Sequence, residues 1–298
     1  MPSKEHESVV QALRQAPALG SGEDFDLTAA RASMAALSAN PQLPEGVEFQ
    51  AIMADGVPAE WVTLPESDPA KTVLYLHGGG YTVGSLISHK SLMAHLAVKC
   101  NATVIGLDYR LAPENPYPAA LDDAVAAFTE MTQSIAPRKI MIAGDSAGGG
   151  LALACVLRLK NEGLPLPACT ALLSPWTDLT CSGESLGQAR DSYAKGAVPY
   201  VGNHRLDTTG ISPLFGDMAG LTPLLIQVAS DESLLDDSVR LEERARAAGV
   251  SVDLRRFDEA FHVFQVITEF PESQDALGDL GGFYKLHIQG VGNDGSRS

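Results

Sequence analysis

The stretch from residue 139 to residue 154 constrains the fold of this chain more than any other. An apolar run over 139–143, typical of a buried strand, stops at Gly144. The next residues read Gly-Asp-Ser-Ala-Gly, centred on Ser146, and further glycines lead into a run of leucine and alanine that favours a helix. A strand, a tight turn with one serine and a helix are typical of a nucleophile elbow, in which the backbone N–H of Ala147 points toward the substrate. We therefore predict that Ser146 is a nucleophile.

The same five-residue pattern occurs once more, at residues 183–187 (Gly-Glu-Ser-Leu-Gly). There it follows the polar run 180–182, and no hydrophobic strand comes before it. The local context therefore predicts a flexible loop at this position rather than a second elbow.

The composition indicates a folded protein with a large core. The 298 residues are enough for two small domains or one large α/β domain, and 45% of them are hydrophobic while 19% are charged. A net charge of −16 disfavours nucleic acid or an anionic membrane as a partner, and no dense basic cluster offsets it. We expect a small molecule to be the partner of this chain.

Targeting signals are not evident in the sequence. The first seven residues are polar, and no apolar run approaches the roughly 20 residues that span a bilayer. The cysteines at 100, 155, 169 and 181 are widely spaced, which favours buried free thiols in a reducing compartment. We therefore expect a cytoplasmic protein.

Strands and helices alternate over most of the chain after Pro69. Strands are predicted over 72–77, 103–108, 139–143, 168–173, 223–229 and 251–257, and helices over about 89–99, 118–132, 146–160, 236–248 and 273–287. This alternation predicts an α/β fold with a mostly parallel, doubly wound sheet covered by helices on both faces. Catalytic groups then belong at the carboxyl ends of the strands.

Two further segments precede this alternation. Residues 47–54 and 57–64 alternate polar and apolar around Asp55-Gly56, which predicts a hairpin at the edge of the sheet. Before it, 3–16 and 26–38 are predicted to form short amphipathic helices, the second capped by Asp26. These helices form either a loose extension or part of a lid.

The region 175–212 interrupts the alternation. It is rich in Gly, Ser, Thr and Tyr, and no long helix is predicted in it. An insertion between strands is where a substrate-shaping segment would lie. We therefore divide the chain into N-terminal cap helices over 1–45 and a catalytic domain over 46–298, with a cap insertion at about 180–212.

A serine nucleophile needs a base within hydrogen-bond reach, and in elbow-type proteins the chain order is serine, acid, histidine. His204, His262 and His287 follow Ser146 in the sequence. His204 lies in the irregular insertion, and His287 lies in the last predicted helix. His262 follows the strand 251–257 after a short loop, at the edge of the sheet where a base is needed, so we predict that it is the base.

The acid that orients this base should follow the preceding strand. Residues 223–230 end at Asp231, which is our first choice, and Asp236 is the second. Asp236 and Asp237 fall in the first turn of the next predicted helix, where the helix dipole stabilises a carboxylate. Asp178 follows the strand 168–173, but within the irregular region.

Backbone N–H groups must also stabilise the oxyanion that forms during acyl transfer. The strand 72–76 runs into His77-Gly78-Gly79-Gly80, where glycines let the main chain approach a substrate. Gly79 and Gly80 are the first choices as donors, with Gly78 as an alternative and Ala147 from the elbow. We expect His77 to anchor this loop.

Phosphate, dinucleotide and metal sites are not indicated. Gly79 and Gly84 have the spacing of a phosphate-binding loop, but Ser85 stands where the lysine should be. The dinucleotide fingerprint does not follow any predicted strand in register, and no zinc or calcium motif is present. We therefore expect no cofactor and no metal.

Several motifs together resemble the bacterial hormone-sensitive-lipase family (family IV) of α/β-hydrolases. They are His-Gly-Gly-Gly at 77–80, Tyr-Arg-Leu-Ala-Pro-Glu at 109–114, Gly-Asp-Ser-Ala-Gly-Gly at 144–149, Ser-Pro-Trp-Thr-Asp-Leu at 174–179 and Asp-Glu-Ser-Leu-Leu-Asp-Asp at 231–237. The resemblance covers roughly 70–270. It implies hydrolysis of carboxylic esters with short to medium acyl chains, and lactone opening in some relatives. It also implies a triad of Ser146, Asp231 and His262, with Gly79, Gly80 and Ala147 as oxyanion donors.

In such proteins the N-terminal helices and a region matching 180–212 form a cap. Here the stretch 189–211 is shorter than is usual in the family and lacks a clear cap helix, which predicts an open site. Tyr193 and Tyr200 either line that site or pack within a small lid.

The leading hypothesis is a serine esterase that forms an acyl-enzyme intermediate. The alternatives are a lactone, amide or thioester hydrolase that uses the same residues, and a small-molecule receptor without catalysis, which the presence of His262 disfavours. Relatives are often homodimers, and the strand 251–257 is expected near an exposed sheet edge where a second copy would pair.

Overall fold

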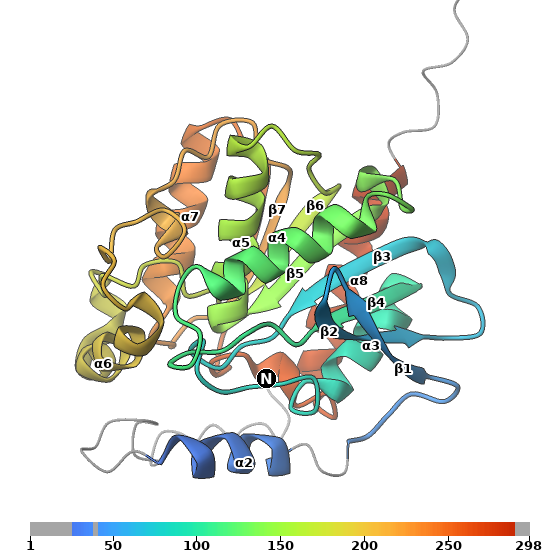
Figure 1. Ribbon diagram of the computed structural model, residues 1–298, viewed down its shortest axis with the longest axis horizontal. Helices are drawn as coiled ribbons and strands as arrows, with labels where there is room; N and C mark the ends of the chain where they lie inside the picture. The colour runs from blue at the N-terminus through green and yellow to red at the C-terminus, as the bar shows by residue number, and fades with distance from the viewer. Residues whose placement is uncertain (1–25, 38–40, 290–298) are drawn as a thin grey trace, which may run out of the picture.

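The computed structural model describes residues 26–37 and 41–289, and these contain one eight-stranded sheet in the order β1-β2-β4-β3-β5-β6-β7-β8 (Figure 1). The strands are β1 (Glu48–Ala54), β2 (Val57–Thr63), β3 (Asp68–Leu76), β4 (Ala102–Leu107), β5 (Ile140–Asp145), β6 (Cys169–Leu173), β7 (Leu224–Ala229) and β8 (Val252–Phe257). The pairs β1–β2 and β2–β4 are antiparallel, and all other neighbours are parallel. The predicted fold class is confirmed, and β8 forms one edge of the sheet.

The described part of the chain contains seven α-helices. They are α2 (Leu27–Leu37), α3 (Lys90–Cys100), α4 (Ala119–Met131), α5 (Ser146–Asn161), α6 (Arg190–Val201), α7 (Leu235–Ala247) and α8 (Pro271–Gln289). Each predicted strand and helix from residue 47 onward is present, with ends that differ by a few residues. The predicted helix over 3–16 lies outside the described residues.

The two faces of the sheet carry separate hydrophobic cores. Along β3, Leu74 and Leu76 belong to the core under α4, α5 and α7, whereas Val73 and Tyr75 belong to the core under α3 and α8. Figure 1 shows α4, α5 and α7 on the near side of the sheet. Because successive residues of a strand point to opposite faces, every residue of a central strand such as β5 is buried. This burial explains why the strands read as continuous apolar runs in the sequence.

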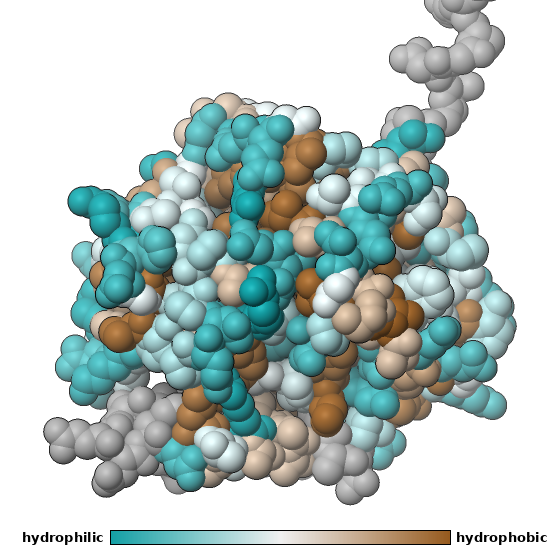
Figure 2. Space-filling view, in the orientation of Figure 1, coloured by the Kyte–Doolittle hydropathy of each residue, from teal (hydrophilic) through white to brown (hydrophobic). Residues whose placement is uncertain are grey.

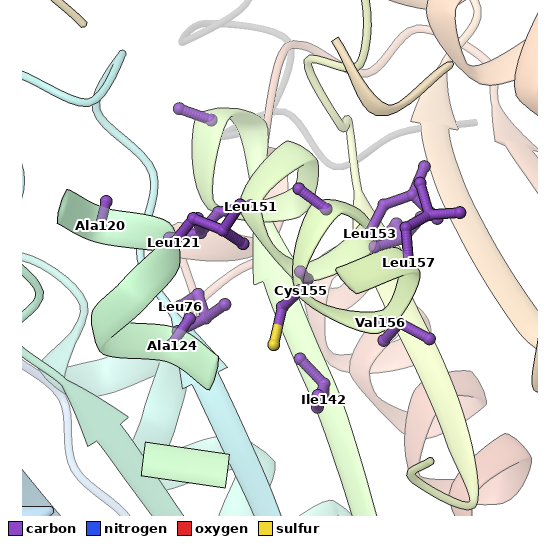
Figure 3. Close-up of a cluster of buried hydrophobic side chains, with 14 of the residues drawn as sticks. Leu76, Ala120, Leu121, Ala124, Ile142, Leu151, Leu153, Cys155, Val156 and Leu157 are labelled. Carbon is purple, nitrogen blue, oxygen red and sulfur yellow. The ribbon is translucent and has the colours of Figure 1, made fainter. Parts of the chain in front are cut away.

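Helix α5 lies at the centre of the core that α4, α5 and α7 cover (Figure 3). Its side chains Leu151 and Cys155 lie between Leu121 of α4 and Ile142 of β5, and all of them are buried. The glycines and alanines near its start let the helix lie close to the sheet. The helix that follows the predicted nucleophile is thus fixed by packing along its length.

The insertion after β6 differs from the prediction. It contains a real helix, α6, over twelve residues, where the sequence predicts no long helix. Gly196 and Pro199 lie within it and weaken its intrinsic propensity, which is why the sequence pattern does not reveal it. Burial of Ala197, Tyr200 and Val201 against the body of the protein stabilises the helix instead.

Helix α2 is attached to the body through Arg31. Its guanidinium donates to both carboxylate oxygens of Glu114 at 2.8 Å and to the carbonyl oxygens of Thr82 and Ala112. The hydrogen bonds from Arg31 lower the pKa of the Glu114 carboxyl to about 2. At the start of the helix, Asp26 accepts a hydrogen bond from the N–H of Ala29, so the predicted cap is confirmed. The described helix is therefore docked on two loops of the body.

One face of the molecule is mostly polar (Figure 2), and the thiols are buried. Figure 2 shows polar residues over most of one face, with smaller apolar areas between them. All four cysteines are buried with free thiols, as predicted. Among the helices that the structure describes, none combines the length and the apolarity that crossing a bilayer requires.

Phe128 provides a test of the core. It lies on α4 with no exposed surface, so Phe128→Ala should lower the free energy of unfolding by about 3–5 kcal/mol through lost burial and a new cavity. Urea denaturation of the full chain measures this change. The exposed Leu286 of α8 is the matched control, because Leu286→Ala should change stability by only about 0.5 kcal/mol. Equal losses in the two variants would contradict the assignment of the core.

Candidate active site

The elbow has the geometry that the sequence predicts. Strand β5 ends at Asp145, and Ser146 begins α5 with a positive φ of 51°. Positive φ is unfavourable for a non-glycine residue and is a recurrent sign of a functional turn. A side chain at Gly148 would come within 2.1 Å of the carbonyl oxygen of Leu76, so only glycine fits there. The hydroxyl of Ser146 is thus presented at the carboxyl end of the sheet.

His262 is the histidine that meets this hydroxyl. Its Nε2 lies 2.9 Å from the Oγ of Ser146, across 116 positions of sequence. It reaches this place from the loop after β8. His204 instead packs edge-on against Tyr117, and His287 packs edge-on against Phe283. The structure therefore brings together the predicted nucleophile and the predicted base.

The acid beside this base is Glu232, and the prediction of Asp231 is wrong. The Nδ1 of His262 lies 2.9 Å from the Oε1 of Glu232, whose side chain is 1% exposed. Asp231 lies on the same turn but is exposed to solvent. The N–H of Ala229, the last residue of β7, donates to Glu232 Oε2 at 3.0 Å and helps fold this carboxylate back toward the sheet. Position 232, rather than the first acid after the strand, thus faces inward.

The other candidate carboxylates hold the insertion that follows β6. Asp236, the second choice for the acid, accepts the N–H of Ser185 at 2.9 Å, and Asp237 accepts the N–H groups of Thr177 and Asp178. Burial raises the pKa of Asp237 to about 7, although these donors oppose the shift. The stretch around Ser185, predicted as a flexible loop, forms a short 3₁₀ helix over Glu184–Ala189. It braces the start of α7.

The glycine loop after β3 supplies the candidate oxyanion donors, with one exception. The N–H of Gly78 donates to the Oδ1 of Asp145 at 2.9 Å, so this group is already used and Gly78 is not a donor to substrate. Gly79 and Gly80 follow with φ of +121° and +60°, values that glycine adopts readily. With Ala147 in the first turn of α5, they remain the candidates for the oxyanion hole.

A buried polar cluster supports this loop from behind. Asp145 accepts the hydroxyl of Tyr75 at 2.6 Å, and the Nε2 of His89 lies 3.3 Å from its other oxygen. The His77 ring stacks on Tyr109 with 4.4 Å between the ring centres. Burial lowers the pKa of His77 to about 4, which keeps it neutral. These contacts fit the expected role of His77 as an anchor of the loop.

The electrostatics of His262 suit a base that accepts a proton. Burial lowers its pKa, but the charge and hydrogen bond of Glu232, with a smaller contribution from Asp145, outweigh burial and raise the pKa above its ordinary value. The imidazolium form is thus stabilised where it would appear during catalysis. Within the described residues, no group of three or more His, Cys, Asp or Glu side chains is placed to hold a metal ion.

Sequence reasoning missed two groups of the site, Glu232 and Ser174. Ser174 follows directly after β6, and its hydroxyl donates to Oε2 of Glu232 at 2.6 Å. For both residues, the signal in the sequence was limited to their position. Ser174 comes directly after a predicted strand, and Glu232 is an acid next to the predicted one. Backbone turns decide which of two neighbouring residues faces inward, and the sequence pattern does not resolve them.

Known proteins resemble this chain over most of its length. Residues 73–266 match the model of a family described by its α/β-hydrolase fold. An acetyl-hydrolase of Streptomyces hygroscopicus is 41% identical, over 76% of this chain and 79% of its own. An esterase of Acinetobacter venetianus is 38% identical, over 82% of this chain and 83% of its own. A crystal structure of an esterase from the bacterial hormone-sensitive lipase family superposes with a TM-score of 0.90 and 35% identity, over 97% of this chain and all of the other.

The identity of the acid can be tested with neighbouring carboxylates. Glu232→Gln removes the charge that steadies the imidazolium, so kcat for p-nitrophenyl butyrate should fall by about 10²–10⁴-fold. Asp231→Asn is the matched control and should keep a kcat close to that of the unchanged protein. A large loss in the Asp231 variant, with little loss in the Glu232 variant, would restore the sequence-based prediction.

The pH profile of the same variants gives an independent measurement. The base must be neutral to accept a proton, so kcat/KM should rise with pH through the raised pKa of His262. Glu232→Gln removes the main interactions that raise this pKa, and the ascending limb should move to lower pH. The ascending limb of the kcat/KM profile of Asp231→Asn should stay at the pH of the unchanged protein.

Proposed function

The chain belongs to the α/β-hydrolase fold family, within its bacterial hormone-sensitive lipase group, and we propose that it is a serine carboxylesterase acting on short- to medium-chain acyl esters. The observation that carries this proposal is the unbroken contact from Ser146 through His262 to Glu232. Its two hydrogen-bond distances are both 2.9 Å. A serine hydroxyl, an imidazole and a buried carboxylate in this order are the elements of acyl transfer to water.

Acylation begins at the serine. Ser146 Oγ attacks the ester carbonyl carbon while His262 Nε2 accepts its proton, and the carbonyl electrons move onto the oxygen. Glu232 holds the ring by Nδ1 and stabilises its positive charge. The tetrahedral intermediate then expels the alkoxide, which takes the proton from His262 and leaves as the alcohol. The acyl group remains on Ser146.

Main-chain amides stabilise the charge on the oxygen. In the proposed arrangement the N–H groups of Gly79 and Gly80 converge on the oxyanion with that of Ala147. Ala147 lies in the first turn of α5, where the helix dipole also favours negative charge. Asp145 supports the hole by holding the N–H of the preceding Gly78.

Water completes the cycle by the same route. His262, neutral again, takes a proton from water as the hydroxide attacks the acyl carbon. The second tetrahedral intermediate collapses, His262 returns the proton to Ser146, and the carboxylic acid is released. No metal or cofactor is required for these steps.

The cap supports a preference for shorter acyl chains. Tyr200 of α6 stacks on Tyr81 with 3.7 Å between ring centres, and Tyr193 packs edge-on against Trp176 at 5.3 Å. The backbone N–H of Trp176 donates to the carbonyl oxygen of Ser146, so this aromatic cluster begins next to the nucleophile. We infer that its rings fill space that a long acyl chain would need.

Removal of the nucleophile tests the mechanism. Ser146→Ala should lower kcat for p-nitrophenyl butyrate by about 10⁶-fold, because the chemical step loses its attacking atom. Ser185→Ala is the matched control, since Ser185 lies in the second Gly-x-Ser-x-Gly sequence but bonds the carbonyl of Ser233. Near-normal turnover in the Ser146 variant would eliminate the proposed mechanism.

A series of p-nitrophenyl esters tests the acyl preference. From acetyl to dodecanoyl, kcat/KM should be highest for short and medium chains and fall by about tenfold or more at dodecanoyl, since misfitted methylenes lose transition-state binding. Tyr193→Ala removes a ring of the cap and should raise the relative rate for the longer esters. Equal rates across the series in the unchanged protein would contradict a size limit set by the cap.

A further inference from the structure

The end of β6 occupies a central place in the site. In the sheet, β6 lies between β5, which directly precedes Ser146, and β7, which precedes Glu232. The loop with His262 follows β8, on the far side of β7. A residue at the carboxyl end of β6 can therefore reach the acid and the base loop at once. That residue is Ser174.

The hydroxyl of Ser174 uses both of its hydrogen-bonding roles. It donates to Glu232 Oε2 at 2.6 Å, the carboxylate oxygen that does not face His262. It also accepts the N–H of Val263 at 3.2 Å, and Val263 is the residue directly after the base. One side-chain oxygen thus connects the acid to the backbone that carries the base.

The backbone around this hydroxyl is held in unusual conformations. Ser174 has a φ of +46° and Val263 a φ of +53°, which is rare for a β-branched residue. Ser174 is fully buried, and its own N–H donates to the carbonyl of Gln227 at 2.7 Å. Strained residues persist only where the surrounding contacts fix them, and they cluster at functional sites.

We propose that Ser174 is a positioning residue that sets the Glu232–His262 pair in its reactive orientation. This inference rests on the proposed serine hydrolysis. With Oε2 held by Ser174 and by the N–H of Ala229, the carboxylate presents Oε1 to Nδ1 of the ring. Ser174 also accepts the N–H of Val263, which fixes the backbone next to His262. We infer that this contact sets the position of the His262 ring relative to Ser146. A group that orients a catalytic pair acts through geometry, and errors of about 1 Å can cost about 10²-fold in rate.

Other charged groups near the pair do not replace this hydroxyl. Asp145, from β5, acts on His262 only through its charge. Tyr193, from α6, lies close enough to Glu232 for the carboxylate charge to raise its pKa further, after burial as the main cause. Asp231, Asp258 and Glu259 lie on the adjoining loops and are exposed.

The test compares Ser174→Ala and Ser174→Gly with the unchanged protein. Both variants lose the hydroxyl, and the glycine variant also relieves the positive φ, so it separates loss of the hydroxyl from failure to fold. We expect kcat for p-nitrophenyl butyrate to fall by about 10–100-fold in both, with KM changed by less than about threefold. The ascending limb of kcat/KM should move to lower pH, in the direction of Glu232→Gln, because a loosened carboxylate raises the pKa of His262 less.

Ser273→Ala is the matched control. Ser273 is also a buried serine, at the start of α8. Its hydroxyl donates at 2.9 Å to the carbonyl of Phe264, which lies in the loop of His262 but outside the Glu232–His262 pair. It should lower the melting temperature without moving the pH limb. Unchanged kcat in both Ser174 variants, or a limb that stays in place or moves to higher pH, would overturn the proposal.

The rate at which a fluorophosphonate labels Ser146 separates this inference from the proposed function. Labelling reports activation of the serine whatever the natural substrate is. Slower labelling in the Ser174 variants, in a protein that cleaves no ester, would support the positioning role while rejecting the esterase. Labelling as fast as in the unchanged protein would reject the positioning role alone.

Discussion

The contact between the ring of His262 and its two partners is the interaction on which the rest of the site depends. One nitrogen meets the hydroxyl of Ser146 and the other meets the carboxylate of Glu232, each at 2.9 Å. The three residues follow the carboxyl ends of three parallel strands of one sheet, β5, β7 and β8. Such strands end at the same edge, so a doubly wound sheet can bring together groups that are far apart in sequence. The two hydrophobic cores keep those strand ends in register.

Several other polar contacts hold loops and a helix against the body of the protein. Asp145 fixes the glycine loop through the N–H of Gly78, and Asp237 fixes the start of the insertion after β6 through the N–H of Thr177. Arg31 fixes helix α2 on the loops around Thr82 and Ala112. In each case a buried or half-buried ionisable side chain binds main-chain groups from a distant segment. Charged groups satisfied in this way orient a loop with more specificity than apolar packing provides.

The sequence predicted the elements with strong local signals. The elbow at Ser146 was predictable because a buried strand, a glycine turn and a helix each leave a pattern, and His262 was predictable from its place after a strand. Glu232 was not, because two adjacent carboxylates follow β7 and the turn between strand and helix decides which one is buried. Helix α6 was missed because Gly196 and Pro199 lower its propensity, while its stability comes from buried Tyr200 and Val201. Ser174 directly follows a predicted strand, but its role was not predictable, since that role depends on contacts across the sheet.

The most direct test of this account is a crystal structure of the protein after reaction with diethyl p-nitrophenyl phosphate, which mimics the tetrahedral intermediate on the serine. We predict phosphorus bonded to Oγ of Ser146, with a phosphoryl oxygen about 3 Å from the N–H groups of Gly79, Gly80 and Ala147. His262 should remain between the adduct and Glu232, with Ser174 on the far carboxylate oxygen. An adduct on another residue, a phosphoryl oxygen turned away from the glycine loop, or a His262 ring bound to Asp231 would contradict the account.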